Sequence, residues 1–303
     1  MTLVALVGAT ASGKSAIALD VARRLGDVEI VTVDSMQVYR GLDIGTAKPT
    51  ADERAEVPHH LLDLVDPEEE FSVAEFQRAA RAAIDDIRGR GKRPLLVGGT
   101  GLYLRAVVDD LDLPGQFPEV RRDLAREPDV ERLHARLVEL DPLAASRTTT
   151  TNRRRIERAL EVTIGSGRPF SSYGPGLEAY PPGPAIVGVD VPLDELDRRI
   201  EARVHAMLDA GLVEEAGALR GRTLSRTASR ALGYEELLAH LTGDLARSDA
   251  VSMTIQRTRR LARRQLRWFR RDPRVVWTPP DEAPRVVTDA LGGVTLRQAH
   301  HDR

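Results

Sequence analysis

The feature that most constrains the fold is the segment at residues 8–15, which reads Gly-Ala-Thr-Ala-Ser-Gly-Lys-Ser. It fits the pattern G-x-x-x-x-G-K-[ST] and lies between an apolar run at Leu3 to Val7 and a helical stripe from Lys14 to Leu25. In this setting backbone N–H groups, the positive end of the helix and a lysine converge on a phosphate. The segment is therefore predicted to be a P-loop. Its predicted phosphate- or diphosphate-binding residues are Gly8, Thr10, Ala11, Ser12, Gly13, Lys14 and Ser15, and Ser15 is also the predicted magnesium ligand.

Strands and helices continue to alternate after this segment. The apolar runs at Glu29 to Val33 and Leu95 to Val97 predict buried strands, and Ser72 with Glu75 has the spacing of a capping box at the start of a helix. Such alternation favours an α/β fold with a doubly wound parallel sheet, in which ligands bind at the carboxyl ends of the strands. The predicted fold class is thus a P-loop doubly wound parallel sheet with a helical insertion domain.

The insertion is predicted from a change of pattern after residue 113. Short helical segments at Val120 to Arg126, Val130 to Leu140 and Arg153 to Ile164 replace the alternation, and Ala185 to Val191 then resumes it as a strand. The predicted domains are a P-loop core domain of residues 1–113 and 185–303, which includes a C-terminal basic helix, and a helical insertion domain of residues 114–184.

Charge is distributed unevenly along the chain. The formal net charge is −2, yet residues 253–274 hold nine arginines and one carboxylate, so this segment carries +8 and the rest of the chain −10. On a helix, arginines at three- and four-residue spacing share one face that can follow a phosphate backbone. These arginines are Arg257, Arg260, Arg264, Arg267 and Arg271.

Aromatic residues within the basic segment add a second expectation. Trp268 and Phe269 could stack on unpaired bases of a nucleic acid, or they could face the protein core from a helix whose other side is solvated, as we expect for Phe269. A second basic cluster lies in the insertion, at Arg153, Arg154, Arg155 and Arg158. Two basic clusters and a phosphate-binding loop in one chain favour contact with nucleic acid.

Composition excludes several classes of protein. A chain without cysteine cannot be a disulfide scaffold, hold a thiolate metal site or use a cysteine nucleophile. No stretch approaches the roughly 20 apolar residues of a membrane span, and Leu3 to Val7 is too short for the core of a signal peptide. We therefore expect a cytoplasmic protein with no membrane contact, and a monomer.

Polar residues follow the predicted strands. Asp34 ends the second strand and is followed by Ser35, Met36 and Gln37, which suit contact with a nucleophile and a ring, although an aspartate there can also form only a turn. The strand at Leu95 to Val97 ends in Gly-Gly-Thr-Gly, without the acidic residue that holds magnesium in typical nucleotide hydrolases.

Three further polar residues have less specific surroundings. Arg230, ahead of a glycine turn, is either a phosphate ligand or a surface residue. His59 and His60 have no partners at metal-ligand spacing, which favours hydrogen-bonded structural histidines.

Together these segments resemble the tRNA dimethylallyltransferase family, also called tRNA isopentenyl-adenosine synthases, and the resemblance runs nearly end to end. The Asp-Ser-Met-Gln and Gly-Gly-Thr-Gly-Leu-Tyr blocks in this order behind a P-loop are far more specific than the P-loop alone. The matching segments are residues 8–15, 34–39, 45–49, 58–61, 98–103, 158–162, 233–234 and 264–265.

The resemblance implies transfer of a dimethylallyl group from dimethylallyl diphosphate to N6 of the adenosine 3′-adjacent to the anticodon, in tRNAs that read codons beginning with U. It implies Asp34 as acceptor of the N6 proton, Thr100 as a contact of the leaving oxygen and Arg230 as the group that neutralises the departing diphosphate. It implies that the P-loop holds this diphosphate with Mg²⁺, although the motif by itself would also suit ATP. The residues expected to contact the tRNA anticodon stem-loop are Asp34, Ser35, Met36, Gln37, Thr100, Arg121, Arg155, Arg158, Arg230, Gly233, Tyr234, Arg257, Arg260, Arg264 and Arg267, with Ser35 and Gln37 holding the flipped adenine.

Two other functions stay open on the residues alone. A small-molecule kinase shares the P-loop and could use Asp34 to receive a hydroxyl proton, but a magnesium-binding acid after the Leu95 to Val97 strand would have favoured it. A non-catalytic RNA-binding protein with a P-loop switch would need the basic helix but neither Asp34 nor Thr100.

Overall fold

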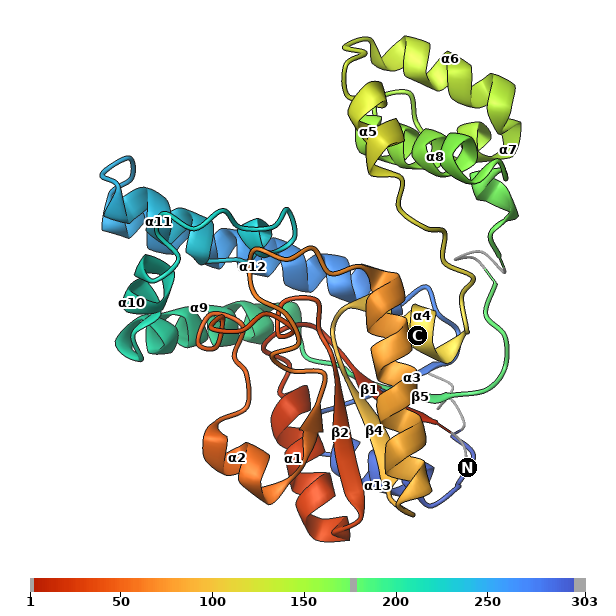
Figure 1. Ribbon diagram of the computed structural model, residues 1–303. Coiled ribbons are helices and arrows are strands. Elements are labelled where there is room, and N and C mark those ends of the chain that lie inside the picture. Colours follow the sequence, from red (N-terminus) through yellow and green to blue (C-terminus); the bar gives the residue numbers. More distant parts are fainter. Residues whose placement is uncertain (1–2, 175–178, 297–303) are drawn as a thin grey trace. The chain divides into compact units, whose positions relative to one another are not determined.

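The computed structural model describes residues 3–174 and 179–296 (Figure 1). Contacts within the chain divide it into two compact units, one of residues 109–181 and one formed by the segments on either side. The expected domains had their boundaries at residues 114 and 184. Among the described helices, none is long and apolar enough to cross a bilayer.

The larger unit is built on a six-stranded sheet in which every paired strand is parallel. This confirms the predicted α/β class, and the strand order β3-β2-β4-β1-β5-β6 places β1 in the interior. The strands are β1 (Val4–Val7), β2 (Val28–Val33), β3 (His59–His60), β4 (Arg93–Gly98), β5 (Ala185–Val189) and β6 (Val275–Thr278).

Two of these strands, β3 and β6, were not predicted, because each is at a sheet edge and only a few residues long. In β3 the histidines are hydrogen-bonded, as predicted: His59 to the Val57 carbonyl and His60 to the Glu29 carboxylate, each at 2.7 Å.

Alternating side chains of the strands supply two hydrophobic layers. Val4 and Leu6 of β1 belong to the layer covered by α1 (Lys14–Leu25), α9 (Leu193–Asp209) and α13 (Ala283–Leu291). Ala5 and Val7 belong to the opposite layer, covered by α3 (Val73–Gly89) and α4 (Gly101–Val108). The predicted capping box is present: Ser72 caps α3 and Glu75 bonds back to it. Both faces of the sheet are therefore covered, as a doubly wound fold requires.

Further helices complete this unit. The basic segment forms α12 (Arg247–Phe269), and its apolar stripe at Ile255, Ala262, Leu266 and Phe269 is buried. The remaining helices are α2 (Ala51–Glu56), α10 (Leu212–Gly217), the short η2 (Ala228–Arg230) and α11 (Tyr234–Leu241).

The smaller unit is helical, and its three predicted helices are confirmed within a few residues. Leu124, Leu137, Ile156 and Leu160 form its own buried core. A short additional helix begins at Pro142, which suits the first position of a helix because the missing N–H is not needed there. The elements are α5 (Pro118–Leu124), α6 (Val130–Leu140), α7 (Pro142–Ser146), α8 (Arg153–Ser166) and η1 (Phe170–Ser172).

Candidate active site

The sheet register brings the predicted site residues together at the carboxyl ends of the strands. Val7 of β1 and Val33 of β2 both pair with Gly98 of β4, so the three strands end at the same level. The residues that follow them, the P-loop, Asp34 and the Gly-Gly-Thr-Gly turn, are therefore neighbours, as predicted for the carboxyl ends of parallel strands.

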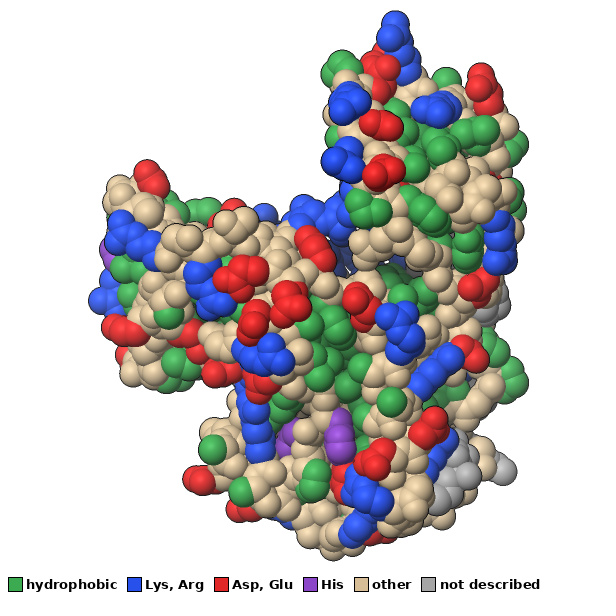
Figure 2. Space-filling view, in the orientation of Figure 1, with side chains coloured by type: hydrophobic (Ala, Val, Ile, Leu, Met, Phe, Trp, Pro, Cys, Tyr) green, Lys and Arg blue, Asp and Glu red, His purple; other side chains and the backbone are tan. Residues whose placement is uncertain are grey.

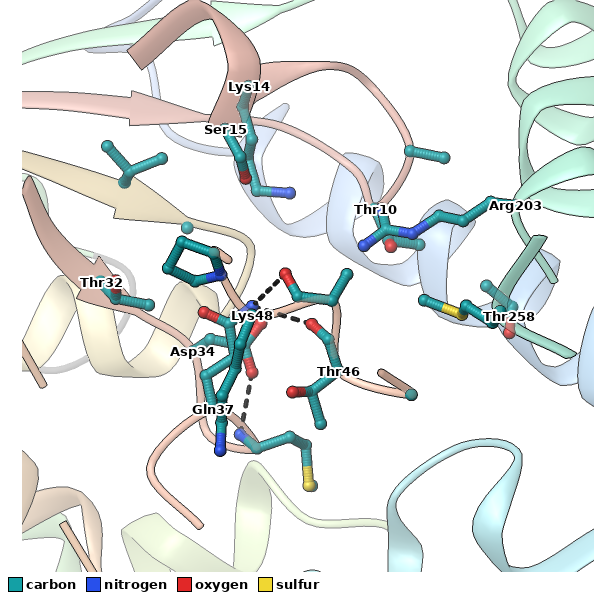
Figure 3. Close-up of a pocket in the computed structure, with 18 of the residues that line it drawn as sticks. Thr10, Lys14, Ser15, Thr32, Asp34, Gln37, Thr46, Lys48, Arg203 and Thr258 are labelled. Atoms are coloured by element: carbon teal, nitrogen blue, oxygen red, sulfur yellow. Dashed lines mark hydrogen bonds between the residues drawn. The ribbon is translucent and has the colours of Figure 1, made fainter. Parts of the chain in front are cut away.

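A cavity of about 580 Å³ opens at this edge (Figure 3). Its walls come from the P-loop, the end of β2, the loop after Gly45, α9 and α12. Of the residues predicted to bind phosphate or adenine, those that line it are Thr10, Ala11, Gly13, Lys14, Ser15, Asp34, Met36 and Gln37.

The P-loop offers the cavity a positively polarised surface. Helix α1 begins after Gly13 with no side-chain cap and no acidic residue in its first turn, so its first N–H groups are open to an anion. Burial and, to a smaller extent, the charge of Arg203 lower the pKa of the Lys14 ammonium to about 8, and Asp34 opposes the shift. Ser12 is buried, so its side chain does not line the cavity.

Arg203 is a cavity residue that the sequence analysis missed. Its side chain extends from α9 toward Thr10 (Figure 3), and burial lowers its pKa while Asp34 opposes that shift. No carboxylate in the described part of the chain forms an ion pair with it. The four-residue spacing from Arg199 is visible in the sequence, but the nearby acids Glu195 and Glu201 make this stretch resemble a solvated helix face.

Asp34 both shapes its turn and lies in the cavity, so the two readings of this residue are compatible. Its Oδ1 accepts the backbone N–H of Met36 at 2.8 Å. Burial raises the pKa of the Asp34 carboxyl, and the Met36 hydrogen bond and the charges of Lys14 and Arg203 counteract that rise. Thr100 lies beside it, with its hydroxyl accepting the backbone N–H of Ser35 at 3.3 Å.

Helix α12 packs directly against the P-loop. Gln265 accepts the backbone N–H of Thr10 at 2.8 Å. Gly101 lets the helix approach, since a Cβ at this position would lie 2.1 Å from the Trp268 ring. Phe269 is buried within the hydrophobic layer, which confirms that it faces the core, and the half-buried Trp268 packs against the same layer.

Three residues around the turn at 230–234 differ from expectation. Arg230 is exposed, and the cavity wall in this region is formed by Ala231 and Leu232 instead. Gly233 and Tyr234 are buried, and the Tyr234 hydroxyl donates to Glu215 at 2.5 Å. The prediction that Gly233 and Tyr234 contact tRNA is therefore corrected, because neither residue reaches the surface.

The arginines of the basic segment fall into two groups. Figure 2 shows acidic and basic side chains interspersed over the face that it draws. Several arginines of the basic segment form ion pairs. Arg257 contacts Glu235 at 2.7 Å and Glu236 at 2.6 Å, and Arg263 contacts Asp197 at 2.6 Å. Within residues 3–174 and 179–296 the other group has no ion pair and is exposed: Arg260, Arg264, Arg267 and, just past the helix, Arg271.

The insertion shows the same division. Glu161, which is buried, accepts hydrogen bonds from Arg121 at 2.9 Å and pairs with Arg158 at 3.0 Å. These two arginines, both expected to bind tRNA, neutralise a buried carboxylate in the structure. Arg155 is exposed, and no described group pairs with its guanidinium.

Family models match almost the whole chain. The one described as IPP transferase matches residues 37–272, and the one described as Isopentenyl transferase matches residues 1–63. A tRNA dimethylallyltransferase from Nocardioides sp. is 50% identical over 297 residues, which are 96% of this chain and 95% of that protein. A tRNA dimethylallyltransferase from Salinispora tropica is 52% identical over 91% of this chain and 88% of its own.

Solved structures give the same assignment. The tRNA isopentenylpyrophosphate transferase from Bacillus halodurans is 38% identical, with a TM-score of 0.70, over 97% of this chain and 96% of that one. A eukaryotic dimethylallyltransferase acting on tRNA, 24% identical with a TM-score of 0.80 over 98% of this chain and 81% of its own, shares the fold. The chain belongs to the IPP transferase family.

Proposed function

We propose that this chain is a tRNA dimethylallyltransferase, which transfers the dimethylallyl group of dimethylallyl diphosphate to N6 of the adenosine 3′-adjacent to the anticodon. The substrates would be tRNAs that read codons beginning with U. One observation carries the proposal: Lys14 and Arg203, neither of which forms an ion pair with a carboxylate among the described residues, share a single cavity with Asp34. Family membership and relatives named for this reaction support it.

The cavity suits the charge changes of allylic transfer. The bond between the allylic carbon and the diphosphate oxygen breaks, a bond from N6 to that carbon forms, and N6 loses a proton. Lys14, Arg203 and the N–H groups at the start of α1 would stabilise the charge on the leaving diphosphate, the larger contribution to rate. Asp34, whose raised pKa makes it a better proton acceptor than an ordinary aspartate, would take the proton.

The residues of the P-loop fit a magnesium ion. The side chain of Ser15 is exposed, lines the cavity and has no hydrogen-bond partner in the described segments. Mg²⁺ keeps several waters and commonly combines one or two protein ligands with phosphate oxygens. Ser15 would hold the ion that accompanies the diphosphate, and the ion would add positive charge beside the leaving group.

The tRNA must bring its base into this cavity. A stacked adenosine in the anticodon loop reaches the cavity only when it is flipped out. The arginines free to bind the phosphates of the anticodon stem-loop are Arg260, Arg264 and Arg267 on α12 and Arg155 in the insertion. We expect the enzyme to act as a monomer in the cytoplasm.

Incubation with unmodified tRNA, dimethylallyl diphosphate and magnesium, followed by mass analysis of the nucleosides, tests the proposal. We expect N6-dimethylallyladenosine and free diphosphate. A tRNA with guanosine at the target position is the matched control and should give no product. Turnover of ATP without any prenylated nucleoside would overturn the proposal and support a kinase or a switch instead.

A further inference from the structure

The loop at residues 42–48 forms one wall of the cavity, although it contains no helix or strand. Turn hydrogen bonds and the Lys48–Asp43 ion pair hold it from within, and one carboxylate from a distant part of the chain binds its backbone. Glu215 of α10 accepts the backbone N–H groups of Asp43 at 3.0 Å, Ile44 at 2.8 Å and Gly45 at 3.0 Å. Three convergent N–H donors on one carboxylate define the path of this backbone segment.

Tyr234 completes this clamp. Its hydroxyl donates to the Glu215 carboxylate at 2.5 Å, and its buried ring lies against the loop at Gly45. A Cβ at Gly45 would lie 2.6 Å from the ring, so only glycine allows this approach. Glu215 therefore holds the loop by hydrogen bonds, and the Tyr234 ring holds it by packing against Gly45.

The held loop in turn fixes Gln37. The side-chain nitrogen of Gln37 donates to the carbonyls of Thr46 at 2.8 Å and Ala47 at 3.1 Å (Figure 3). Backbone carbonyls only accept, so this arrangement determines which end of the amide is the nitrogen and uses both of its hydrogens. The amide oxygen of Gln37 remains, in the described part of the chain, without a donor, on a residue that lines the cavity.

We propose that Glu215 is a positioning residue which, through the 42–48 loop, makes Gln37 present only a hydrogen-bond acceptor to the base in the cavity. This inference rests on the proposed function and deepens it. Adenine carries an amine that can donate to such an acceptor, whereas inosine and guanine carry a carbonyl oxygen at the same ring position. Two acceptors brought face to face leave both unsatisfied, which disfavours the carbonyl-bearing bases.

The test measures binding without the prenyl donor. Dissociation constants are determined for two anticodon stem-loops that differ only in adenosine or inosine at the target position. The ratio of the inosine to the adenosine dissociation constant should be about 5 to 150 in the wild type, the range for one buried acceptor left unpaired. Gln37→Ala should bring this ratio close to one.

Variants of Glu215 and Tyr234 distinguish a loss of Gln37 positioning from a general loss of structure. Glu215→Gln replaces one accepting oxygen by an amide NH2, which cannot accept from the loop N–H groups, and should reduce the ratio several-fold. Tyr234→Phe, which removes one hydrogen bond, should reduce it less. Glu214→Gln is the matched control, because Glu214 is the exposed neighbour with no described partner, and it should leave the ratio unchanged. Binding of inorganic diphosphate should be the same in all of these proteins.

A double mutant gives the sharpest outcome. If Glu215 acts through Gln37, the ratio for Glu215→Gln with Gln37→Ala should equal that of Gln37→Ala alone, because both changes remove the same contact. The inference would be overturned if the effects of the two substitutions on this ratio multiplied in the double mutant. It would also be overturned if neither Glu215→Gln nor Tyr234→Phe changed the ratio. A wild type with no preference for adenosine would overturn it even if prenylation occurs, whereas preference without prenylation would overturn only the proposed function.

Discussion

The cavity and the basic helix α12 both carry positive charge, but their cations differ in solvation and in ion pairing. In the cavity, Lys14 and Arg203 are desolvated, their pKa values are lowered, and Asp34 is the carboxylate that acts on both. On α12, part of the arginines pair with acids of α9 and α11, and the others are in water. A desolvated cation without a counter-ion is costly unless an anion arrives, whereas a solvated one costs little and gains little.

The number of arginines in a segment therefore shows how many could contact a phosphate, but not which of them are free to do so. The nine arginines at residues 253–274 suggested one uniform nucleic-acid surface. The structure divides them by their partners, and Arg203, whose pKa is lowered by burial in the cavity, lies outside that segment. The predictions below test whether the two regions differ as much in function as in environment.

The largest effect is expected at the centre of the cavity. Lys14→Ala should abolish transfer, because the change removes a charge that serves both the bound diphosphate and the leaving group. The measurement is single-turnover prenylation with tRNA affinity determined in parallel. Transfer at a normal rate would mean that the P-loop does not hold the donor, and the contrast between the two regions would lose its basis.

Asp34→Asn should lower turnover by about 10²- to 10⁴-fold, the usual contribution of a general base. The amide keeps an oxygen for the Met36 N–H, so the turn should survive and tRNA affinity should stay close to that of the wild type. A near-normal single-turnover rate would show that Asp34 serves only to form the turn.

Arg203→Gln should weaken binding of dimethylallyl diphosphate by about 10- to 100-fold, the value of a charge-assisted hydrogen bond of about 1.5–3 kcal/mol. The matched control is Arg198→Gln, since Arg198 lies on the same helix but is exposed and paired with Asp194. Calorimetry with the diphosphate donor distinguishes them. Equal affinities in the two variants would remove Arg203 from the site.

The pH dependence of kcat/KM for the donor should be bell-shaped. Asp34 must be ionised to accept a proton, so its raised pKa places the acidic limb above the range of an ordinary aspartate. Lys14 must be charged to attract the diphosphate, so activity should fall above about pH 8. Along each limb kcat/KM should change about tenfold per pH unit, and Lys14→Arg should shift only the alkaline limb, to higher pH.

Local patterns made the P-loop and the residues at the carboxyl ends of β2 and β4 predictable. The glycine-lysine spacing, the capping box at Ser72 and the apolar runs are each contained in a few consecutive residues, so the sequence displays them directly. Asp34 could be placed because parallel strands end at a common edge.

Contacts between distant segments were not predictable in the same way. Glu215 reaches a loop 171 residues away at Ile44, and no local pattern distinguishes it from Glu214. The direction of Trp268 depends on the space left by Gly101, which lies in another element. Which arginines are free depends on where α9 and α11 place their acids, and composition does not contain that information.

The smallest effect is expected on α12, and it separates the two groups of arginines there. Replacing Arg260 and Arg264 by Gln removes two exposed charges without a described ion pair. If both contact tRNA phosphates, the slope of log affinity against log salt should fall by about 1.4 to 1.8, since each contact releases about 0.7 to 0.9 counterions. Affinity for dimethylallyl diphosphate should not change, because neither residue lines the cavity.

The matched control replaces Arg259 and Arg263, which pair with Glu201 at 2.7 Å and Asp197 at 2.6 Å. These pairs join α12 to α9, so their loss should lower the melting temperature and leave the salt slope as it is. If the two double variants instead gave the same salt slope, pairing in the free protein would not decide which arginines meet tRNA. The solvated side of α12 would then have to be regarded as one continuous basic surface.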